Sequence, residues 1–172
     1  MSVDQSPNFV LIDFASDGDH GDWMIINDGV MGGRSTSRMS ESDSGSAVFS
    51  GEVSLANNGG FASTRSPISI PDMSEFTGVR LRVCGDGQRY RFRIRTDAEF
   101  DGVAYQLSFD TVKDAWIDVN LPFAQFAPSF RGRPVPEAGP LNPERIRQIG
   151  FLIADKQAGP FALKIKSIAF YR

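Results

Sequence analysis

Apolar and basic residues alternate through most of the stretch Val79-Arg80-Leu81-Arg82-Val83-Cys84-Gly85-Asp86-Gly87-Gln88-Arg89-Tyr90-Arg91-Phe92-Arg93-Ile94-Arg95. Alternation with a period of two is typical of a β-strand that has one buried face and one solvent face. Gly85-Asp86-Gly87 interrupts the pattern with residues that favour a tight turn. The stretch therefore predicts two strands joined as a β-hairpin, with one polar face made of Arg80, Arg82, Arg91, Arg93 and Arg95.

The same texture extends in both directions along the chain. Its 17 glycines and 10 prolines separate short runs rich in β-branched and aromatic residues, which predicts many strands with tight connections. Further strands are expected at residues 9–14, 23–27, 35–40, 47–55, 61–65, 103–109, 116–121, 149–154 and 161–171, with 35–40 and 47–55 paired as a hairpin.

Two segments are expected to depart from this pattern. Prolines between residues 122 and 140 predict a compact irregular loop, because proline lacks the N–H that a regular strand or helix needs. Asn142 followed by Pro143 is typical of a capped helical turn.

So many half-apolar strands favour an all-β fold in which two antiparallel sheets pack face to face as a β-sandwich. A closed β-barrel is the competing architecture. Neither a linker nor an internal repeat divides the chain, so residues 1–172 are expected to form one domain.

Composition narrows the classes of function. A net charge of -3 and a pI near 5.1 argue against nucleic-acid binding by bulk positive charge. The one cysteine, Cys84, excludes an internal disulfide and a cysteine zinc cluster. The sequence has no signal-peptide pattern and no apolar run of the roughly 18 residues that a membrane span needs, so we expect a cytoplasmic protein without direct membrane insertion.

Catalytic chemistry is difficult to assemble from these residues. His20 is the only histidine, and the glycine-rich segment from Asp28 to Ser35 matches neither the Walker nor the dinucleotide-binding pattern. We therefore expect neither an enzyme nor a cofactor. The acidic turn Asp17-Gly18-Asp19-His20-Gly21-Asp22 offers oxygen ligands for a structural cation, although it lacks the spacing of a calcium loop and such turns are common.

The predicted arginine face has two interpretations. Carboxylates such as Asp110 and Asp118 on adjacent strands can neutralise it. Alternatively, Arg82, Arg91 and Arg93 form a ligand face together with Trp116, because an exposed tryptophan is a platform for sugars or guanidinium groups. That second interpretation predicts a carbohydrate-binding module.

Several segments together resemble the thirty-kilodalton type of the complex I intermediate-associated protein family. They are Trp23 with Asn27-Asp28-Gly29-Val30-Met31-Gly32-Gly33-Arg34-Ser35, Phe49-Ser50-Gly51-Glu52-Val53-Ser54-Leu55, Asn57-Asn58-Gly59-Gly60-Phe61-Ala62-Ser63 with Arg65, Gly85-Asp86-Gly87 with Tyr90, Trp116 with Pro122-Phe123, and Phe151-Leu152-Ile153-Ala154-Asp155-Lys156-Gln157 with Gly159-Pro160-Phe161. They follow one another in the family's order over nearly the whole chain. The resemblance implies a galactose-binding-like jelly-roll fold.

The resemblance also implies a function. Mitochondrial relatives are assembly chaperones for respiratory complex I, so we expect a non-catalytic module that binds protein subunits of a membrane-associated respiratory or photosynthetic complex, from a bacterial member of the family. The family motifs supply the expected partner-binding residues: Trp23, Asp28, Met31, Arg34, Arg65, Asp155 and Lys156. The resulting prediction is a cytoplasmic protein that lies at the periphery of a membrane complex. Carbohydrate binding is the alternative function.

Overall fold

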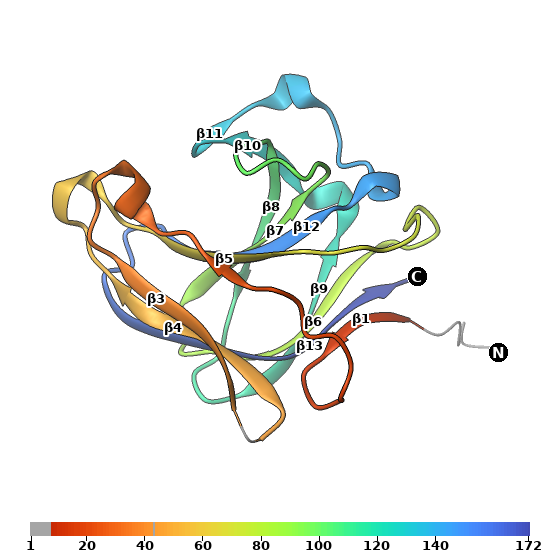
Figure 1. Cartoon of the computed structure of the whole chain (residues 1–172), viewed down its shortest axis with the longest axis horizontal. Helices are drawn as coiled ribbons and strands as arrows, with labels where there is room; N and C mark the ends of the chain where they lie inside the picture. Colours follow the sequence, from red (N-terminus) through yellow and green to blue (C-terminus); the bar gives the residue numbers. More distant parts are fainter. Residues whose placement is uncertain (1–7, 43) are drawn as a thin grey trace.

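The computed structural model describes residues 8–42 and 44–172, apart from the side chains of Val30, Met31 and Asn58. Its chain forms two antiparallel β-sheets that pack face to face (Figure 1). The all-β sandwich expected from the alternating patterns is therefore confirmed, and the barrel alternative is wrong. No helix in the described part of the chain is long and apolar enough to span a bilayer.

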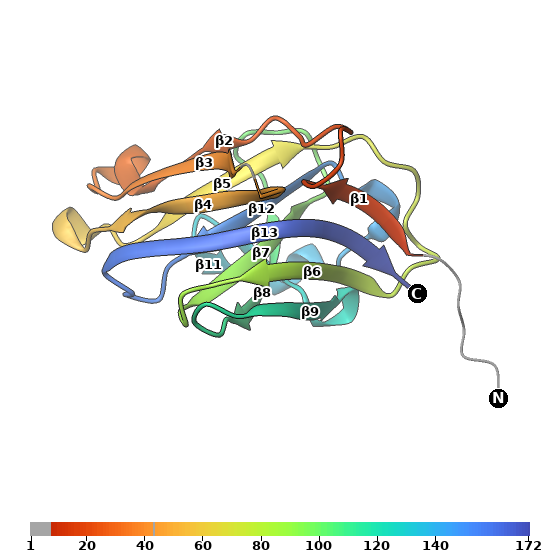
Figure 2. The ribbon, with the colours of Figure 1, turned by 90° about the horizontal axis from the view of Figure 1, so that it is seen from below.

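The six-stranded sheet is organised around its longest strand, β13 (Gly159–Tyr171). One edge of β13 pairs first with β4 and then with β1, while its other edge pairs with β6. This sheet is nearer the viewer in Figure 2. Its other strands are β1 (Phe9–Asp13), β3 (Thr36–Ser42), β4 (Ser46–Val53), β6 (Gly78–Cys84) and β9 (Trp116–Pro122), and its order is β3-β4-β13-β6-β9.

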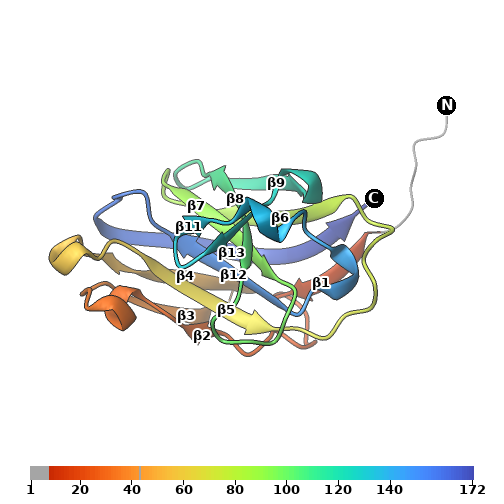
Figure 3. The same ribbon diagram turned by 90° about the horizontal axis from the view of Figure 1, so that it is seen from above.

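The seven-stranded sheet faces the viewer in Figure 3. At its centre β12 lies between β5 and β7. In spatial order its strands are β11 (Arg133–Pro134), β10 (Ala127–Phe130), β8 (Ala104–Asp110), β7 (Arg89–Arg95), β12 (Gln148–Ile153), β5 (Ala62–Pro67) and β2 (Met24–Ile25).

In the described part of the chain, five short 3-10 helices lie in the connections between strands. The last of them confirms the predicted cap, because the Asn142 side chain accepts a hydrogen bond from the Glu144 N–H at 3.0 Å. The helices are η1 (Asp28–Met31), η2 (Ala56–Asn58), η3 (Phe123–Gln125), η4 (Pro136–Ala138) and η5 (Pro143–Arg145).

Residues 122–140 are more regular than expected. They contain η3, the short strands β10 and β11, and η4. Pro134 lies in β11, the edge strand, and Pro128 lies in β10 next to it, just before the pairing of β10 with β11 begins at Ser129. Proline is tolerated there because an edge strand leaves some of its N–H groups unpaired in any case.

The core lies between the inner faces of the two sheets. Phe92 of β7 and Phe151 of β12 pack edge to face, with ring centroids 5.2 Å apart, and both are fully buried. From the opposite sheet, Leu81 and Phe170 are also fully buried. The alternation predicted within β6 and β7 is thus confirmed, since their apolar residues are buried and their arginines are more exposed.

The predicted hairpin between β6 and β7 is wrong. β6 belongs to the six-stranded sheet and β7 to the seven-stranded one, so the intervening glycines carry the chain from one sheet to the other. The Asp86 carboxylate stabilises this crossing, because it accepts hydrogen bonds from the Tyr90 hydroxyl on β7 at 3.0 Å and from the Ala162 N–H on β13 at 2.9 Å. Burial, and then the charge of Asp86, raises the pKa of the Tyr90 hydroxyl, which keeps it a hydrogen-bond donor.

Candidate functional site: an arginine-lined groove

The outer face of the seven-stranded sheet is hollowed into a groove of about 560 Å³, a size typical of ligand sites. Among the described residues, its lining includes five arginines and one carboxylate, that of Asp101. These five residues, called here the groove arginines, are Arg65, Arg91, Arg93, Arg95 and Arg131.

The strand register shows which of the groove arginines lie beside one another on the sheet. Gly150 of β12 is the partner of Arg93 on β7 and of Arg65 on β5. Because Gly150 has no side chain, it leaves a slot on the outer face between the two arginines. Gln106 of β8 extends the same row as the partner of Arg93.

The connection between β7 and β8 forms one wall of the groove. Sheet side chains donate hydrogen bonds to its carbonyl groups: Arg95 to Gly102 at 2.7 Å, Arg65 to Phe100 at 2.5 Å, and Gln148 to both Asp97 and Glu99 at 2.9 Å. The Arg65 guanidinium also lies 4.6 Å from the centroid of the Phe100 ring. Phe100 is nonetheless 60% exposed, so it presents an aromatic surface at the mouth of the groove.

Charge compensation within the groove is uneven. Arg91 pairs with Asp155 at 2.5 Å, and Arg131 pairs with Asp101. Arg93 makes neither a hydrogen bond nor an ion pair within residues 8–42 and 44–172, and its Nε is buried without a partner, as is the Nε of Arg65. Burial, and then the charges of the neighbouring arginines, lowers the pKa of Arg93 to about 10. The groove therefore holds excess positive charge.

Asp28, one of the residues predicted to bind a partner, is instead buried at the end of the sandwich, with 1% of its surface exposed. Its carboxylate accepts hydrogen bonds from the Ser35 N–H at 2.9 Å, the Ser35 hydroxyl at 2.6 Å and the Gly60 N–H at 2.7 Å. Burial acts to raise the pKa of Asp28, but these hydrogen bonds together hold it below its ordinary value. Asp28 therefore joins the η1 and η2 loops and does not offer a contact surface.

The other residues predicted from the family motifs occupy different environments. Trp23 is partly buried: its ring packs against Phe151, with centroids 6.0 Å apart, and its Nε1–H donates to the His20 carbonyl at 2.7 Å. Arg34 is exposed beside η1. Met31 lies in η1, and its side chain is outside the described residues.

Asp155 and Lys156 are exposed in the β12–β13 connection, and both have a positive φ. The Gln157 side chain holds this loop against β7, since it accepts from the Arg89 N–H at 2.8 Å and donates to the Arg89 carbonyl at 2.7 Å. The η1, η2 and β12–β13 loops gather at one end of the sandwich (Figures 1 and 2). Of the seven predicted residues, Arg65 lies in the groove and Asp155 reaches it through Arg91.

The proposed face of Arg82, Arg91, Arg93 and Trp116 does not exist as one surface. Arg82 on β6 and Trp116 on β9 lie in the six-stranded sheet, whereas Arg91 and Arg93 lie in the seven-stranded one. The two pairs of residues are separated because the chain crosses from one sheet to the other between β6 and β7. On the six-stranded sheet Arg82 forms an ion pair with Asp118 at 3.6 Å. This pair agrees with the interpretation that carboxylates on adjacent strands neutralise the arginines.

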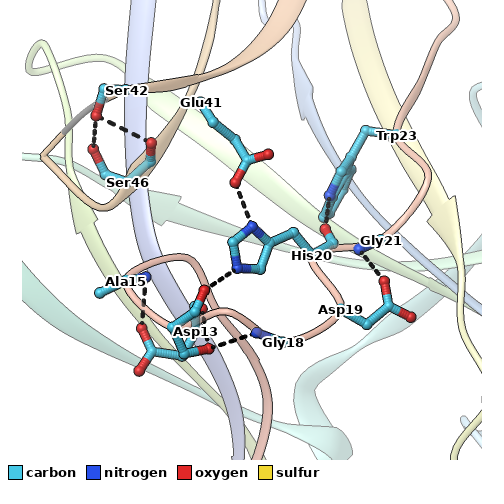
Figure 4. Close-up of polar contacts among 11 residues, drawn as sticks. Asp13, Ala15, Gly18, Asp19, His20, Gly21, Trp23, Glu41, Ser42 and Ser46 are labelled. Carbon is cyan, nitrogen blue, oxygen red and sulfur yellow. Dashed lines mark hydrogen bonds and ion pairs between the residues drawn. The ribbon is translucent and has the colours of Figure 1, made fainter.

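The acidic turn around His20 is held by its own hydrogen bonds (Figure 4). The His20 ring bonds to Glu41 through Nδ1 and to the Ser16 carbonyl through Nε2, while Asp19 accepts from the Gly21 N–H at 2.8 Å. The described residues bring no three His, Cys, Asp or Glu side chains together in a way that could hold a metal.

Sequence reasoning missed several groove residues. The alternating pattern places Arg95 on the polar face but does not assign it to a binding site. No strand pattern or family motif in the sequence points to Phe100, Gln148 or Arg131. One signal for the site was present in the sequence: in the segment Asp97-Ala98-Glu99-Phe100-Asp101, an aromatic residue stands among acidic residues, as is typical of an exposed segment. Only the fold shows that this segment meets β12.

Comparison with solved structures supports the fold. Solved structures with the same fold include the family 11 carbohydrate-binding module of the cellulosomal cellulase Lic26A-Cel5E of Clostridium thermocellum, with a TM-score of 0.72, 18% identity, and coverage of 96% of this chain and 95% of that one. A second structure of that module, in complex with a β-1,3-1,4-mixed-linked tetrasaccharide, gives a TM-score of 0.71 at 18% identity and covers 97% of each chain. The chain is a galactose-binding-like jelly-roll sandwich.

The family follows from sequence. The family model described as Complex I intermediate-associated protein 30 (CIA30) matches residues 12–165, and the chain belongs to this family. It is 32% identical to the mitochondrial Complex I intermediate-associated protein 30 of Mus musculus, over 87% of this chain and 52% of that protein. The Drosophila melanogaster protein of the same name is 25% identical over 91% of this chain and 60% of its own length. This chain thus spans about half the length of the mouse relative.

Proposed function

We propose that this chain is a non-catalytic protein-binding module that holds a subunit of a membrane-associated redox complex during assembly. The groove on the seven-stranded sheet is its client surface. The observation that carries the proposal is the excess positive charge around Arg93, next to an exposed aromatic residue, Phe100. Membership in the CIA30 family supports the type of client.

The composition of the groove favours a protein client over a glycan. Protein interfaces are rich in arginine and aromatic residues, and an interface's charged groups fix orientation while apolar ones supply contact area. Sugar-binding platforms commonly use Trp or Tyr, and the described groove lining contains neither. The fold shared with carbohydrate-binding modules does not by itself determine the ligand.

The test is affinity capture from a gently solubilised lysate of the native cells, with bound proteins identified by mass spectrometry. The tagged chain is compared with Arg93→Gln in the groove and Arg82→Gln on the opposite sheet. We expect subunits of a respiratory or photosynthetic complex with the unchanged chain and with Arg82→Gln, and their loss with Arg93→Gln. Recovery of the same subunits by Arg93→Gln, or of no redox-complex subunit by any form, would contradict the proposal.

A further inference from the structure

The chemistry of a ligand can be inferred from the charges that the groove leaves without partners. Arg93 has no protein acceptor in the described part of the chain, although its Nε is buried. Arg65 is only 7% exposed; its Nη2 donates to the Phe100 carbonyl, but its Nε has no partner among the same described residues. In each of the two guanidinium groups the buried donor without a partner is the Nε–H, and burying a donor without an acceptor is costly. These donors therefore indicate an acceptor that comes from outside the chain.

The register determines where such an acceptor fits. Arg65 and Arg93 lie two strands apart with Gly150 between them. Strands are spaced by about 4.8 Å, so the two backbones are about 10 Å apart, which is a span that two long arginine side chains can close around one group. A side chain at Gly150 would not fit without a shift of β5, because its Cβ would lie 2.6 Å from the Thr64 carbonyl oxygen and 3.0 Å from the Arg65 Cβ.

The nearby carboxylates act on the neighbours of Arg93: the charges of Asp97 and Asp101 favour the charged forms of Arg65 and Arg95, whereas the charges that act on Arg93 are those of other arginines. Asp155 pairs with Arg91 at one end of the groove, and Asp101 pairs with Arg131 at the other. Arg95 follows Arg93 by two residues on the same face of β7, which brings a third guanidinium close to the slot. Positive charges on neighbouring positions of a sheet destabilise the folded state unless an anion lies among them.

We propose that the slot above Gly150 binds an oxyanion, a carboxylate or a phosphate group, between the guanidinium groups of Arg65, Arg93 and Arg95. Guanidinium groups bind both kinds of oxyanion through paired N–H donors, so the shared chemistry is a planar or tetrahedral oxygen acceptor. The inference deepens the proposed function and rests on it in taking this groove as the binding surface. In that setting the oxyanion is an acidic side chain of the client, or else a phosphate group.

The test is an NMR titration of the whole chain that follows the backbone amides of the groove. The probes are inorganic phosphate and a blocked peptide of alternating Glu and Val, with the matched Gln-Val peptide and sodium chloride as controls. We expect the Gly150 amide and its neighbours to shift with phosphate, with the Glu peptide or with both, and not with the controls. Tighter binding of the Glu peptide assigns the oxyanion to a protein carboxylate, and tighter binding of phosphate assigns it to a phosphate-bearing ligand.

The variants test the residues. Arg93→Gln is expected to weaken binding about tenfold or more, the size of one charge-assisted hydrogen bond, whereas Arg82→Gln leaves it unchanged. Arg93→Lys, which keeps the charge but loses the paired donors, is expected to fall between them, and a melting curve of each variant checks folding. No shift with either probe, or equal binding by Arg93→Gln and Arg82→Gln, overturns the site. If the probes bind while capture recovers no redox-complex subunit, the oxyanion chemistry stands and the client assignment fails.

Discussion

The Asp28 carboxylate accepts two hydrogen bonds from the single residue Ser35, one from its N–H at 2.9 Å and one from its hydroxyl at 2.6 Å. A third hydrogen bond, from Gly60, joins this pair to the η2 loop. The glycine-rich segment from Asp28 to Ser35 therefore forms a junction of two loops around a buried charge.

Asp28→Asn tests this junction. The amide keeps one acceptor oxygen but turns its NH2 group toward backbone donors, so we expect a loss of about 2–4 kcal/mol in the free energy of unfolding. Urea denaturation measures it. Asp118→Asn is the matched control, because Asp118 is exposed and its pair with Arg82 is long, and it is expected to change stability by less than about 0.5 kcal/mol. Equal stability of the two variants would show that the junction is dispensable.

The two nearby glycines Gly33 and Gly29 make a second matched pair. A Cβ on Gly33 would lie 2.3 Å from the Asp28 Cγ, whereas a Cβ on Gly29 meets no atom within 4 Å. Gly33→Ala is therefore expected to destabilise the fold by about 1–3 kcal/mol, and Gly29→Ala to change it by less than about 0.5 kcal/mol. Thermal unfolding of both proteins measures the difference. A harmless Gly33→Ala would mean that Asp28 does not occupy the position described.

His20 predicts a pH dependence. Its pKa is raised above 6.5, chiefly by the hydrogen bond to Glu41 and then by the Ser16 carbonyl. Protonation therefore favours the folded chain: this contribution is fully present below pH 6.5 and is lost as the pH rises through the folded-state pKa. Melting temperatures between about pH 5.5 and pH 8.5 should fall more steeply for the unchanged chain than for His20→Gln or Glu41→Gln. Parallel curves for all three proteins would rule out this linkage.

The charge of Arg93, which has no partner among the residues that the structure describes, predicts an unusual stability effect. Arg93→Gln removes one of several adjacent like charges, so we expect its melting temperature to equal or exceed that of the unchanged chain. Added sodium chloride should stabilise the unchanged chain more than the variant, because salt screens the repulsion that the variant lacks. A clear loss of stability in Arg93→Gln at all salt concentrations would indicate an internal partner for Arg93.

Much of the fold could be predicted from local patterns. Alternation in β6 and β7 gave the buried and exposed faces of both strands, and the β3–β4 hairpin was expected from the residues between them. Which sheet each strand joins could not be read in this way. A short glycine-containing connection fits a hairpin and a crossing between sheets equally well. In this fold the hydrogen bonds of Asp86 with Tyr90 and Ala162 stabilise the crossing.

The site was less predictable than the fold. Family motifs pointed to Arg65 and Asp155, which do reach the groove, but they equally pointed to Asp28, whose role is internal. A motif residue under structural constraint and one that contacts a ligand look alike in a single sequence. The slot at Gly150 depends on partners from three strands that lie far apart along the chain, so only the register reveals it.

The most direct test of the central claim places a photo-crosslinking amino acid at one of two exposed aromatic positions. Phe100 lies at the mouth of the groove, and Trp116 lies on the opposite sheet. They are 60% and 38% exposed, so both are accessible. After irradiation of native cells, we predict a crosslink from position 100 to a subunit of a membrane-associated redox complex and none from position 116. A crosslink to such a subunit from position 116 alone, or from neither position, would contradict the account.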